Sequence, residues 1–315
     1  MNLNTFQKTA IATVIATLFL IFVGGLVRAA GAGLGCPDWP TCFGLWIPPT
    51  SVADLPAGFD ASQFNVYKTW IEYLNRLVGV VIGLLIIATF AFSFRYRSDK
   101  PSVFYSSGAA LVLVLIQGWL GGQVVKSGLN EWMITIHMIL ALIIVNTLLY
   151  ASFKATTGMI SIKVGEKLRK QLLWVTGIVL ALTLVQLVLG TQVREAVDVI
   201  KNGAYVPPRS SWVEMLMDGI FPVHRSFSWA LLLAAGWMYY ILRKEYAGGW
   251  VLWLGQAVIA LVLVQLGTGI GLAYLDMPRV LQVLHLLGVA LMVCGQFLLI
   301  LVLTITAISG KTKRA

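Results

Sequence analysis

Long apolar runs separated by short polar segments dominate the chain. Eight runs are long enough to cross a bilayer, since a spanning helix needs about 20 predominantly apolar residues. Backbone groups in lipid must satisfy one another, so each run is predicted to be an α-helix. The predicted spans are Thr9–Ala29, Thr69–Phe94, Val103–Val125, Trp132–Phe153, Gln171–Val193, Pro222–Leu242, Gly249–Leu275 and Val280–Ser309. The pattern therefore predicts an all-α membrane protein.

The composition also favours lipid over water around these helices. Of the 315 residues, 58% are hydrophobic and only 11% are charged, whereas soluble domains carry about 25% charged residues. The net charge of +10 would suit nucleic acid. However, the basic residues cluster between the apolar runs and form no basic stripe interleaved with aromatic side chains. We therefore expect contact with membrane lipid and no nucleic acid.

Lys and Arg in the short connections predict the orientation. Loops rich in these residues stay on the cytoplasmic side of a membrane. The basic residues assigned to inner segments are Lys8, Arg95, Arg97, Lys100, Lys154, Lys163, Lys167, Arg169, Lys170, Arg243, Lys244, Lys311, Lys313 and Arg314. Both termini are therefore expected in the cytoplasm, with long outer loops at Ala30–Lys68 and Arg194–Phe221. The expected location is a bacterial inner membrane, crossed eight times.

The second half of the chain repeats the first. His137 and His285 are 148 residues apart, and each follows a glutamine in a glycine-rich helix by 20 residues. Asn75 and His224 are 149 residues apart, and an arginine follows each. Four spans per half give the halves the same topology, related by an axis along the membrane normal. The repeat predicts two tandem pseudo-symmetric four-helix bundles, residues 1–155 and 156–315.

The chain has only three histidines: His137, His224 and His285. A lone histidine in a span more often bonds to a neighbouring helix than binds a metal. His224 and His285 open two helices of one half at matching depth, and paired imidazoles in a helical bundle are typical haem ligands. They predict a bis-histidine haem site. The first half has His137 and Asn75, which indicates either a decayed site or one that binds transiently.

Glu72 stands one turn before Asn75 on the same helix face. It can pair with Arg76 at the next turn, or it can serve a task that only this half performs, because Phe221 occupies the equivalent place in the other half. Arg76 and Arg225 either reach to the outer interface or pair with carboxylates such as the propionates of a haem. Both interpretations of each residue remain open at this point.

Cys36 and Cys42 flank five residues in the first outer loop. An oxidising compartment favours a disulfide between them. That bond would be either a structural staple or a redox group, since exposed disulfides in short loops can be labile. Cys294 stands alone in an apolar run and is expected to be a small buried hydrophobe.

Taken together, these features resemble the haem A synthase family, membrane enzymes of aerobic respiration. The matching pieces are Gly24-Gly25-Leu26-Val27-Arg28, the Gly31–Gly44 loop with its cysteine pair, Glu72, Asn75-Arg76, His137, His224-Arg225 and His285. The resemblance implies an oxidoreductase acting on a CH group. Such an enzyme oxidises the C8 methyl of haem O to a formyl group and so makes haem A for terminal oxidases.

The resemblance also implies roles for the two halves. The first half receives the substrate haem, and the second holds a haem b cofactor. The substrate-site residues that it implies are Glu72 for catalysis, His137 as iron ligand, and Asn75 and Arg76. The cofactor-site residues are the iron ligands His224 and His285, with Arg225. Asn75 departs from the family pattern, which has a histidine there.

Haem O is thus the expected substrate, and haem O synthase and cytochrome oxidase assembly factors are candidate partners. The oligomeric state, the electron acceptor and the source of the formyl oxygen are left open. An alternative function is a non-catalytic haem-binding or haem-transfer membrane protein. A small-molecule transporter is less favoured, because the histidines lie near the outer edge and transporter sites usually lie near the midplane.

Overall fold

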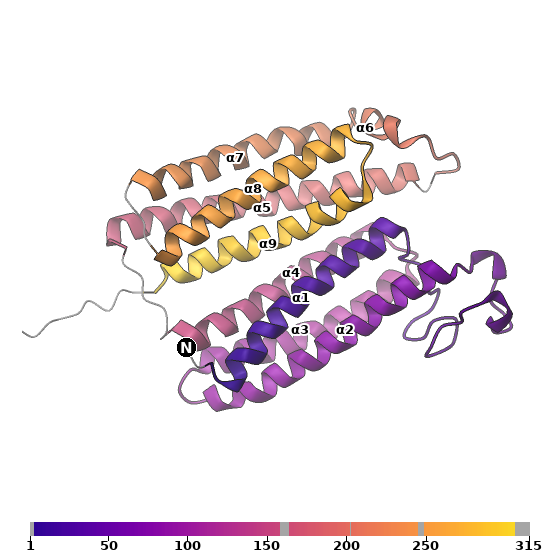
Figure 1. Ribbon diagram of the computed structural model, residues 1–315, viewed down its shortest axis with the longest axis horizontal. Coiled ribbons are helices and arrows are strands. Elements are labelled where there is room, and N and C mark those ends of the chain that lie inside the picture. Colours follow the sequence, from indigo (N-terminus) through magenta and orange to yellow (C-terminus); the bar gives the residue numbers. More distant parts are fainter. Residues whose placement is uncertain (1–2, 158–163, 202, 245–248, 306–315) are drawn as a thin grey trace, which may run out of the picture. The chain divides into compact units, whose positions relative to one another are not determined.

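A computed structural model describes residues 3–157, 164–201, 203–244 and 249–305. Across these ranges the regular structure is helical, with nine α-helices and no strand, which confirms the all-α prediction (Figure 1). The α-helices are α1 (Thr5–Ala30), α2 (Val66–Ser93), α3 (Pro101–Lys126), α4 (Glu131–Thr156), α5 (Glu166–Lys201), α6 (Trp212–Met215), α7 (Phe221–Lys244), α8 (Gly249–Tyr274) and α9 (Arg279–Leu303). Short 3₁₀ helices are η1 (Val52–Asp54), η2 (Ala61–Gln63), η3 (Phe94–Tyr96) and η5 (Arg209–Ser211).

Local sequence determines where several helices begin and end. Asn4 and Gln7 form a capping box at the start of α1, each side chain accepting a hydrogen bond from the other's backbone N–H. Gly31 ends that helix with a φ of 66°, a left-handed conformation that suits glycine. Pro101 opens α3, where its fixed φ fits the first turn and its missing N–H is not needed.

Each of the eight predicted spans coincides with one long helix. In the described ranges, seven helices are long and apolar enough to cross a membrane: α1, α2, α3, α4, α5, α8 and α9. The remaining long helix, α7, falls short because His224 and Arg225 near its start and Arg243 and Lys244 at its end shorten its apolar stretch. The end of the last predicted span, Ser309, and the basic residues Lys163, Lys311, Lys313 and Arg314 lie outside the described residues.

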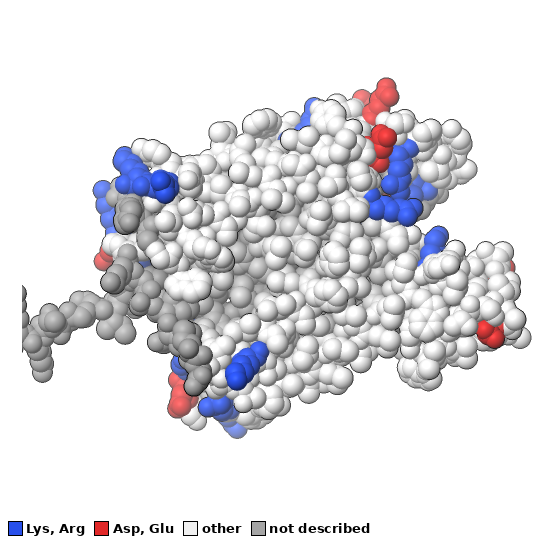
Figure 2. All heavy atoms as spheres, viewed as in Figure 1, with Lys and Arg blue, Asp and Glu red and all other residues white. Residues whose placement is uncertain are grey.

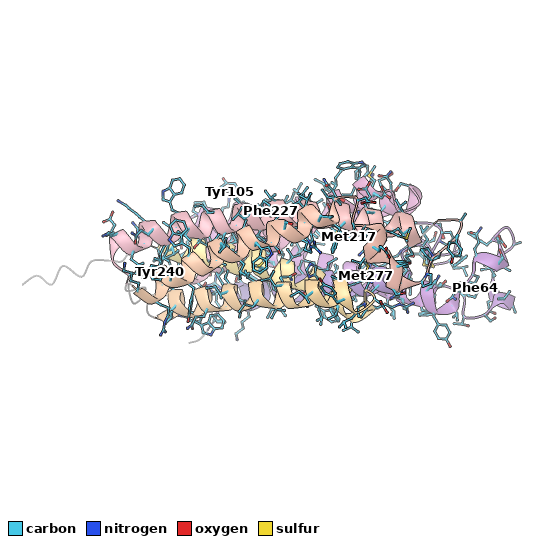
Figure 3. The ribbon with its side chains drawn as sticks, turned by 90° about the horizontal axis from the view of Figure 1, so that it is seen from above. Phe64, Tyr105, Met217, Phe227, Tyr240 and Met277 are labelled. Carbon is cyan, nitrogen blue, oxygen red and sulfur yellow. A yellow bond between two sulfur atoms is a disulfide. The ribbon has the colours of Figure 1, made fainter. Side chains whose placement is uncertain are left out.

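The outward sides of the helices are apolar. On the face seen in Figure 2, the charged side chains gather mainly toward the two ends of the molecule, and most of the surface between them is uncharged. Large apolar side chains project outward in mid-helix, among them Leu115 and Leu233, which are 65% and 72% exposed. Tyr105 of α3 also projects from its helix (Figure 3). Apolar surface on this scale is typical of helices that are solvated by lipid.

The second long loop is shorter than predicted. The sequence placed its start at Arg194, but α5 continues to Lys201. The buried Arg194 approaches Asp198, with 3.7 Å between Nη1 and Oδ2, and this pairing across one turn favours the helical continuation. The following segment contains the short helix α6.

The chain divides into two compact units, each considered by itself. One contains Met1–Lys154 and Thr268–Ala290, and the other contains Ala155–Gly267 and Leu291–Ala315. In the first unit α1 packs along α2, and the Thr13 and Thr89 hydroxyls are 2.9 Å apart. In the second unit α5 packs along α7. The expected halves, residues 1–155 and 156–315, remain a prediction.

Candidate functional site

The first loop is closed by a disulfide between Cys36 and Cys42, as predicted. Both cysteines are completely buried together with Phe43, and four further side chains pack against this cluster. These are Leu55, Phe59, Phe64 and Tyr73. The burial removes the solvent exposure that the redox interpretation assumed and favours the interpretation as a structural staple.

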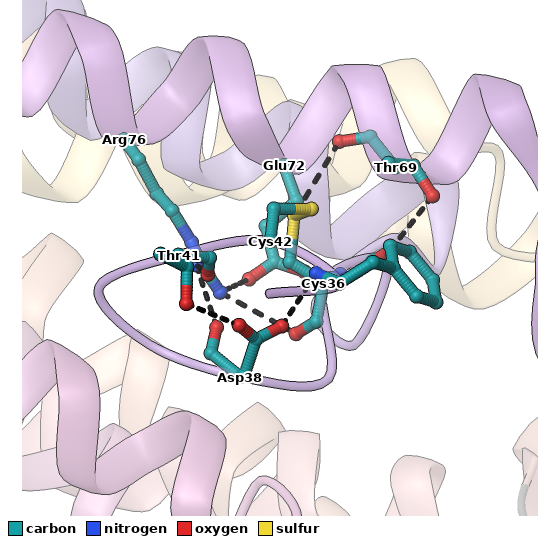
Figure 4. Close-up of polar contacts among 9 residues, drawn as sticks. Cys36, Asp38, Thr41, Cys42, Thr69, Glu72 and Arg76 are labelled. Carbon is teal, nitrogen blue, oxygen red and sulfur yellow. Dashed lines mark hydrogen bonds and ion pairs between the residues drawn. A yellow bond between two sulfur atoms is a disulfide. The ribbon is translucent and has the colours of Figure 1, made fainter. Parts of the chain in front are cut away.

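Glu72 of α2 is buried directly beneath this disulfide. Its side chain accepts a hydrogen bond from the backbone N–H of Cys36, with 2.8 Å between N and Oε2. Its other oxygen, Oε1, pairs with Nη2 of Arg76 at 2.5 Å (Figure 4). The pairing that the sequence offered as one interpretation of Glu72 is therefore present, and the carboxylate also holds the loop to the helix.

Arg76 turns toward the same loop. Its Nη1 donates to the backbone carbonyl oxygens of Asp38 and Thr41, each at 2.8 Å. The Asp38 carboxylate in turn accepts from the backbone N–H of Phe43 and of Gly44 and from the Thr41 hydroxyl. The guanidinium thus joins α2 to the loop through carbonyl oxygens and Glu72, rather than extending to an interface.

A hydrogen bond and two close approaches hold the loop against α2 and α3. The Thr69 hydroxyl donates to the carbonyl oxygen of Gly35 at 2.8 Å. A Cβ atom on Gly35 would lie 2.3 Å from the Lys68 carbonyl oxygen, so only glycine fits there. On α3, a Cβ atom on Gly122 would lie 2.9 Å from the Trp39 ring. These contacts could not be predicted from the sequence, since none of these residue types indicates a site by itself.

His137 of α4 is positioned by two residues of α3. The Gln117 side-chain amide donates from Nε2 to the His137 backbone oxygen at 3.1 Å. A Cβ atom on Gly121, one turn after Gln117, would lie 3.4 Å from Cε1 of the His137 ring. Nδ1 of the ring is buried and has no hydrogen-bond partner among the described residues. The ring is therefore held in place by packing, through its backbone and one face.

His224 of α7 has the same surroundings on α5. Gln186 donates from Nε2 to the His224 backbone oxygen at 2.9 Å. A Cβ atom on Gly190 would lie 3.3 Å from Cε1 of the ring. Arg225, the next residue, is exposed, with its guanidinium carbon 5.8 Å from the centroid of the Phe221 ring. Phe221, which occupies the repeat position of Glu72, is buried.

His285 of α9 is oriented by α8. The Thr268 hydroxyl lies 2.9 Å from Nδ1 of the ring. A Cβ atom on Gly269 would lie 3.6 Å from Cε1. His285 belongs to the first unit and His224 to the second, so each is placed only within its own unit.

A shared sequence pattern underlies the surroundings of all three histidines. Each has, on a neighbouring helix, a glutamine followed four residues later by a glycine. The pairs are Gln117 and Gly121, Gln186 and Gly190, and Gln265 and Gly269. The repeat points to Gln117 and Gln265 in the sequence but not to Gln186. The threefold Gln-x-x-x-Gly pattern was the signal that could have found it.

Asn75 differs from the three histidines. It lies on α2, where Oδ1 is buried and lacks a hydrogen-bond partner in the part of the chain that the structure describes. Within the described ranges, no three His, Cys, Asp or Glu side chains are grouped to hold a metal ion. A porphyrin brings four nitrogen ligands of its own, so single histidines are sufficient axial ligands. The histidine surroundings therefore fit a haem better than a bare metal ion.

Comparison with known proteins identifies the family of the chain. Residues 7–297 match the COX15-CtaA family, described as cytochrome oxidase assembly protein. The heme A synthase of Nitrosomonas eutropha is 27% identical, over 87% of this chain and 86% of the relative. That of Rhodopseudomonas palustris is 29% identical, over 84% and 83%. That of Orientia tsutsugamushi is 31% identical over 44% of each chain.

The family match spans both units and includes every candidate residue from Cys36 to His285. Seven apolar helices and bacterial relatives make this a multi-pass bacterial membrane protein. The chain belongs to the COX15-CtaA family of cytochrome oxidase assembly proteins.

Proposed function

We infer that the chain is a haem A synthase, an oxidoreductase that converts haem O to haem A for a terminal oxidase. The observation that carries this inference is the family match over residues 7–297. Two heme A synthases that align over more than four-fifths of the chain support it. In the proposed reaction the C8 methyl of haem O is oxidised to a formyl group.

We propose that the first half receives haem O, with His137 as its axial ligand. The buried ring, the room that Gly121 leaves for it and the hydrogen bond from Gln117 support this role. A substrate must enter and leave, and a site with one strong ligand suits that better than a site with two. Glu72 belongs to this half only, since buried Phe221 takes its place in the second.

Glu72 and Arg76 act together in this proposal. The Glu72 carboxylate receives the backbone N–H groups of Cys36 and Gly35 and the Arg76 guanidinium, and its two oxygens together can accept about four donors. The remaining capacity allows Glu72 to orient a water molecule or to stabilise positive charge that develops on the substrate. Arg76 binds both the Glu72 carboxylate and the backbone of the disulfide loop, and so it fixes the position of the loop over this end of α2.

The second half is proposed to hold haem b through His224 and His285, with Arg225 beside it. When bound, that haem can accept electrons from the substrate and pass them on. Gln186 and Gly190 set the position of the His224 ring. The hydrogen bond between Thr268 and His285 Nδ1 is of the kind that orients a ligating imidazole.

The proposed arrangement in the membrane is eight spans in two four-helix halves. It adds α7 to the seven apolar helices, because α7 is 24 residues long and its neighbour α5 is one of the seven. Both termini then lie in the cytoplasm of the bacterium, and the disulfide loop lies on the outer side. Haem O synthase and cytochrome oxidase assembly factors are the proposed partners.

Asn75 favours one rival function, a haem-binding or haem-transfer protein without catalysis. Its amide cannot replace a histidine as an iron ligand. Expression with a haem O source, followed by chromatography of the extracted haems, separates the two functions. Haem A in the extract supports the synthase, and haem O with haem b but no haem A supports the rival.

A further inference from the structure

The histidines share a local design, complete for His137 and His224 and shown in part for His285, which a fourth helix pair has lost. The design is a glutamine that donates to the histidine's backbone oxygen and a glycine one turn later that faces its ring. Both features are present for α3 with α4 and for α5 with α7. On α8, Gly269 faces the His285 ring with the same spacing from Gln265.

The fourth pair is α1 with α2. Val27-Arg28 of α1 corresponds to Val193-Arg194 of α5, which places Leu20 and Gly24 at the positions of Gln186 and Gly190. The glycine is therefore kept, while leucine replaces the glutamine. On α2, Asn75 replaces the histidine. The two residues that would position and supply a ligand are thus both absent from this pair.

In the described part of the chain, no side chain lies against Gly24 in the way that a histidine ring lies against the other three glycines. A Cβ atom on each of the other three glycines would meet a histidine Cε1 at 3.3 to 3.6 Å, but one on Gly24 would meet nothing within 4 Å. Oδ1 of Asn75 is buried without a hydrogen-bond partner among the described residues. Leu20 has no polar atom to offer it. The pair therefore lacks the ring that lies against the equivalent glycine in the other three pairs, and its Asn75 carries a buried acceptor.

We propose that Asn75 and Gly24 form a site for a small neutral ligand of the substrate haem, a water molecule or a diatomic gas. The inference rests on the proposed function, in which this half receives haem O. The ligand takes the axial position that corresponds to His224, and His137 takes the other. The Asn75 amide can accept from a bound water through Oδ1 or donate to a diatomic ligand through Nδ2.

Carbon monoxide is the probe that tests this site. Full-length protein is expressed with a haem O source, purified in detergent and reduced, and the spectrum is recorded with and without carbon monoxide. A haem iron with two histidine ligands has no open axial position, so the haem of the second half should not respond. We expect one carbon monoxide-binding haem in the parent chain and loss of that binding in Asn75→His, with a gain of low-spin character.

A second variant and a chromatographic control distinguish failure of this proposal from failure of the proposed function. Asn75→Leu should still bind carbon monoxide but shift its infrared stretching frequency, because the amide no longer contacts the ligand. The inference is overturned if haem O is bound and the parent does not respond, or if both variants behave as the parent. If chromatography of the same sample finds neither haem O nor haem A, the proposed function fails as well.

Discussion

The backbone N–H of Cys36 donates to Oε2 of Glu72 across 2.8 Å, which ties the disulfide loop to the helix that carries Asn75. The same carboxylate pairs with Arg76, and Arg76 binds the carbonyl oxygens of Asp38 and Thr41. One buried acid, together with Arg76, therefore links α2 to the disulfide loop in the proposed substrate half. Its chemical role and its structural role are separable by substitution.

Glu72→Ala should abolish conversion of haem O and also destabilise the first unit. Two buried donors lose their acceptor, and each unsatisfied group costs about 1–3 kcal/mol. Glu72→Gln keeps an acceptor for Cys36 but removes the charge, so it should recover most of the stability and little of the activity. Thermal unfolding and extracted haem content measure the two effects.

Glu166→Gln is the matched control, because Glu166 pairs with Lys170 at the same spacing but is exposed. An exposed pair contributes about 0–1 kcal/mol, so this variant should unfold and convert haem O much as the parent does. Haem A production at the parent rate by Glu72→Ala would remove the catalytic role and leave only the anchoring of the loop.

Gly190→Ala should reduce the haem b content of the purified protein. The added methyl would lie 3.3 Å from Cε1 of His224, so the ring must move from its present position. Gly177→Ala on the same helix is the control, because a Cβ atom there meets nothing within 4 Å. That control should be neutral or gain up to about 1 kcal/mol from better helix propensity. Equal haem b content in the two variants would argue against the proposed position of the His224 ring.

Gln186→Leu and Gln117→Leu should have separate spectroscopic effects. The first removes the hydrogen bond to the His224 backbone and should alter the low-spin haem b spectrum. The second removes the equivalent bond at His137 and should slow haem O conversion while leaving that spectrum unchanged. A general loss of folding would instead change both readouts in both variants.

Removing the disulfide should destabilise the loop without altering the haem b spectrum. A short closed loop such as Cys36–Cys42 contributes roughly 2 kcal/mol by restricting the unfolded chain. Because the two cysteines are joined in a disulfide, neither should react with a thiol reagent in the native, unreduced protein, and their burial should slow reduction of the bond. Ready labelling of both, detected by mass spectrometry, would contradict the structure.

The sequence predicted the helical spans well because the hydrophobic requirement for crossing lipid leaves a long, regular signal. It missed the continuation of α5 beyond Arg194, where polar residues resemble a loop. The approach of Arg194 to Asp198 favours the helix there. For Glu72 the sequence left two interpretations open, pairing with Arg76 or a task that only the first half performs. That pair could be predicted because the two residues are one turn apart on the same helix. The hydrogen bond from Cys36 joins residues that are far apart in the sequence, so it is visible only in the folded structure.

The central claim is that haem O is oxidised in a site whose iron ligand is His137, and one measurement tests it most directly. Cells that supply haem O express the parent chain or His137→Ala, and their haems are extracted and separated by chromatography. We predict haem A from the parent, and from the variant haem O without haem A, with the haem b spectrum of the purified protein retained. Haem A from His137→Ala at the parent level, or its absence from the parent itself, would contradict the account.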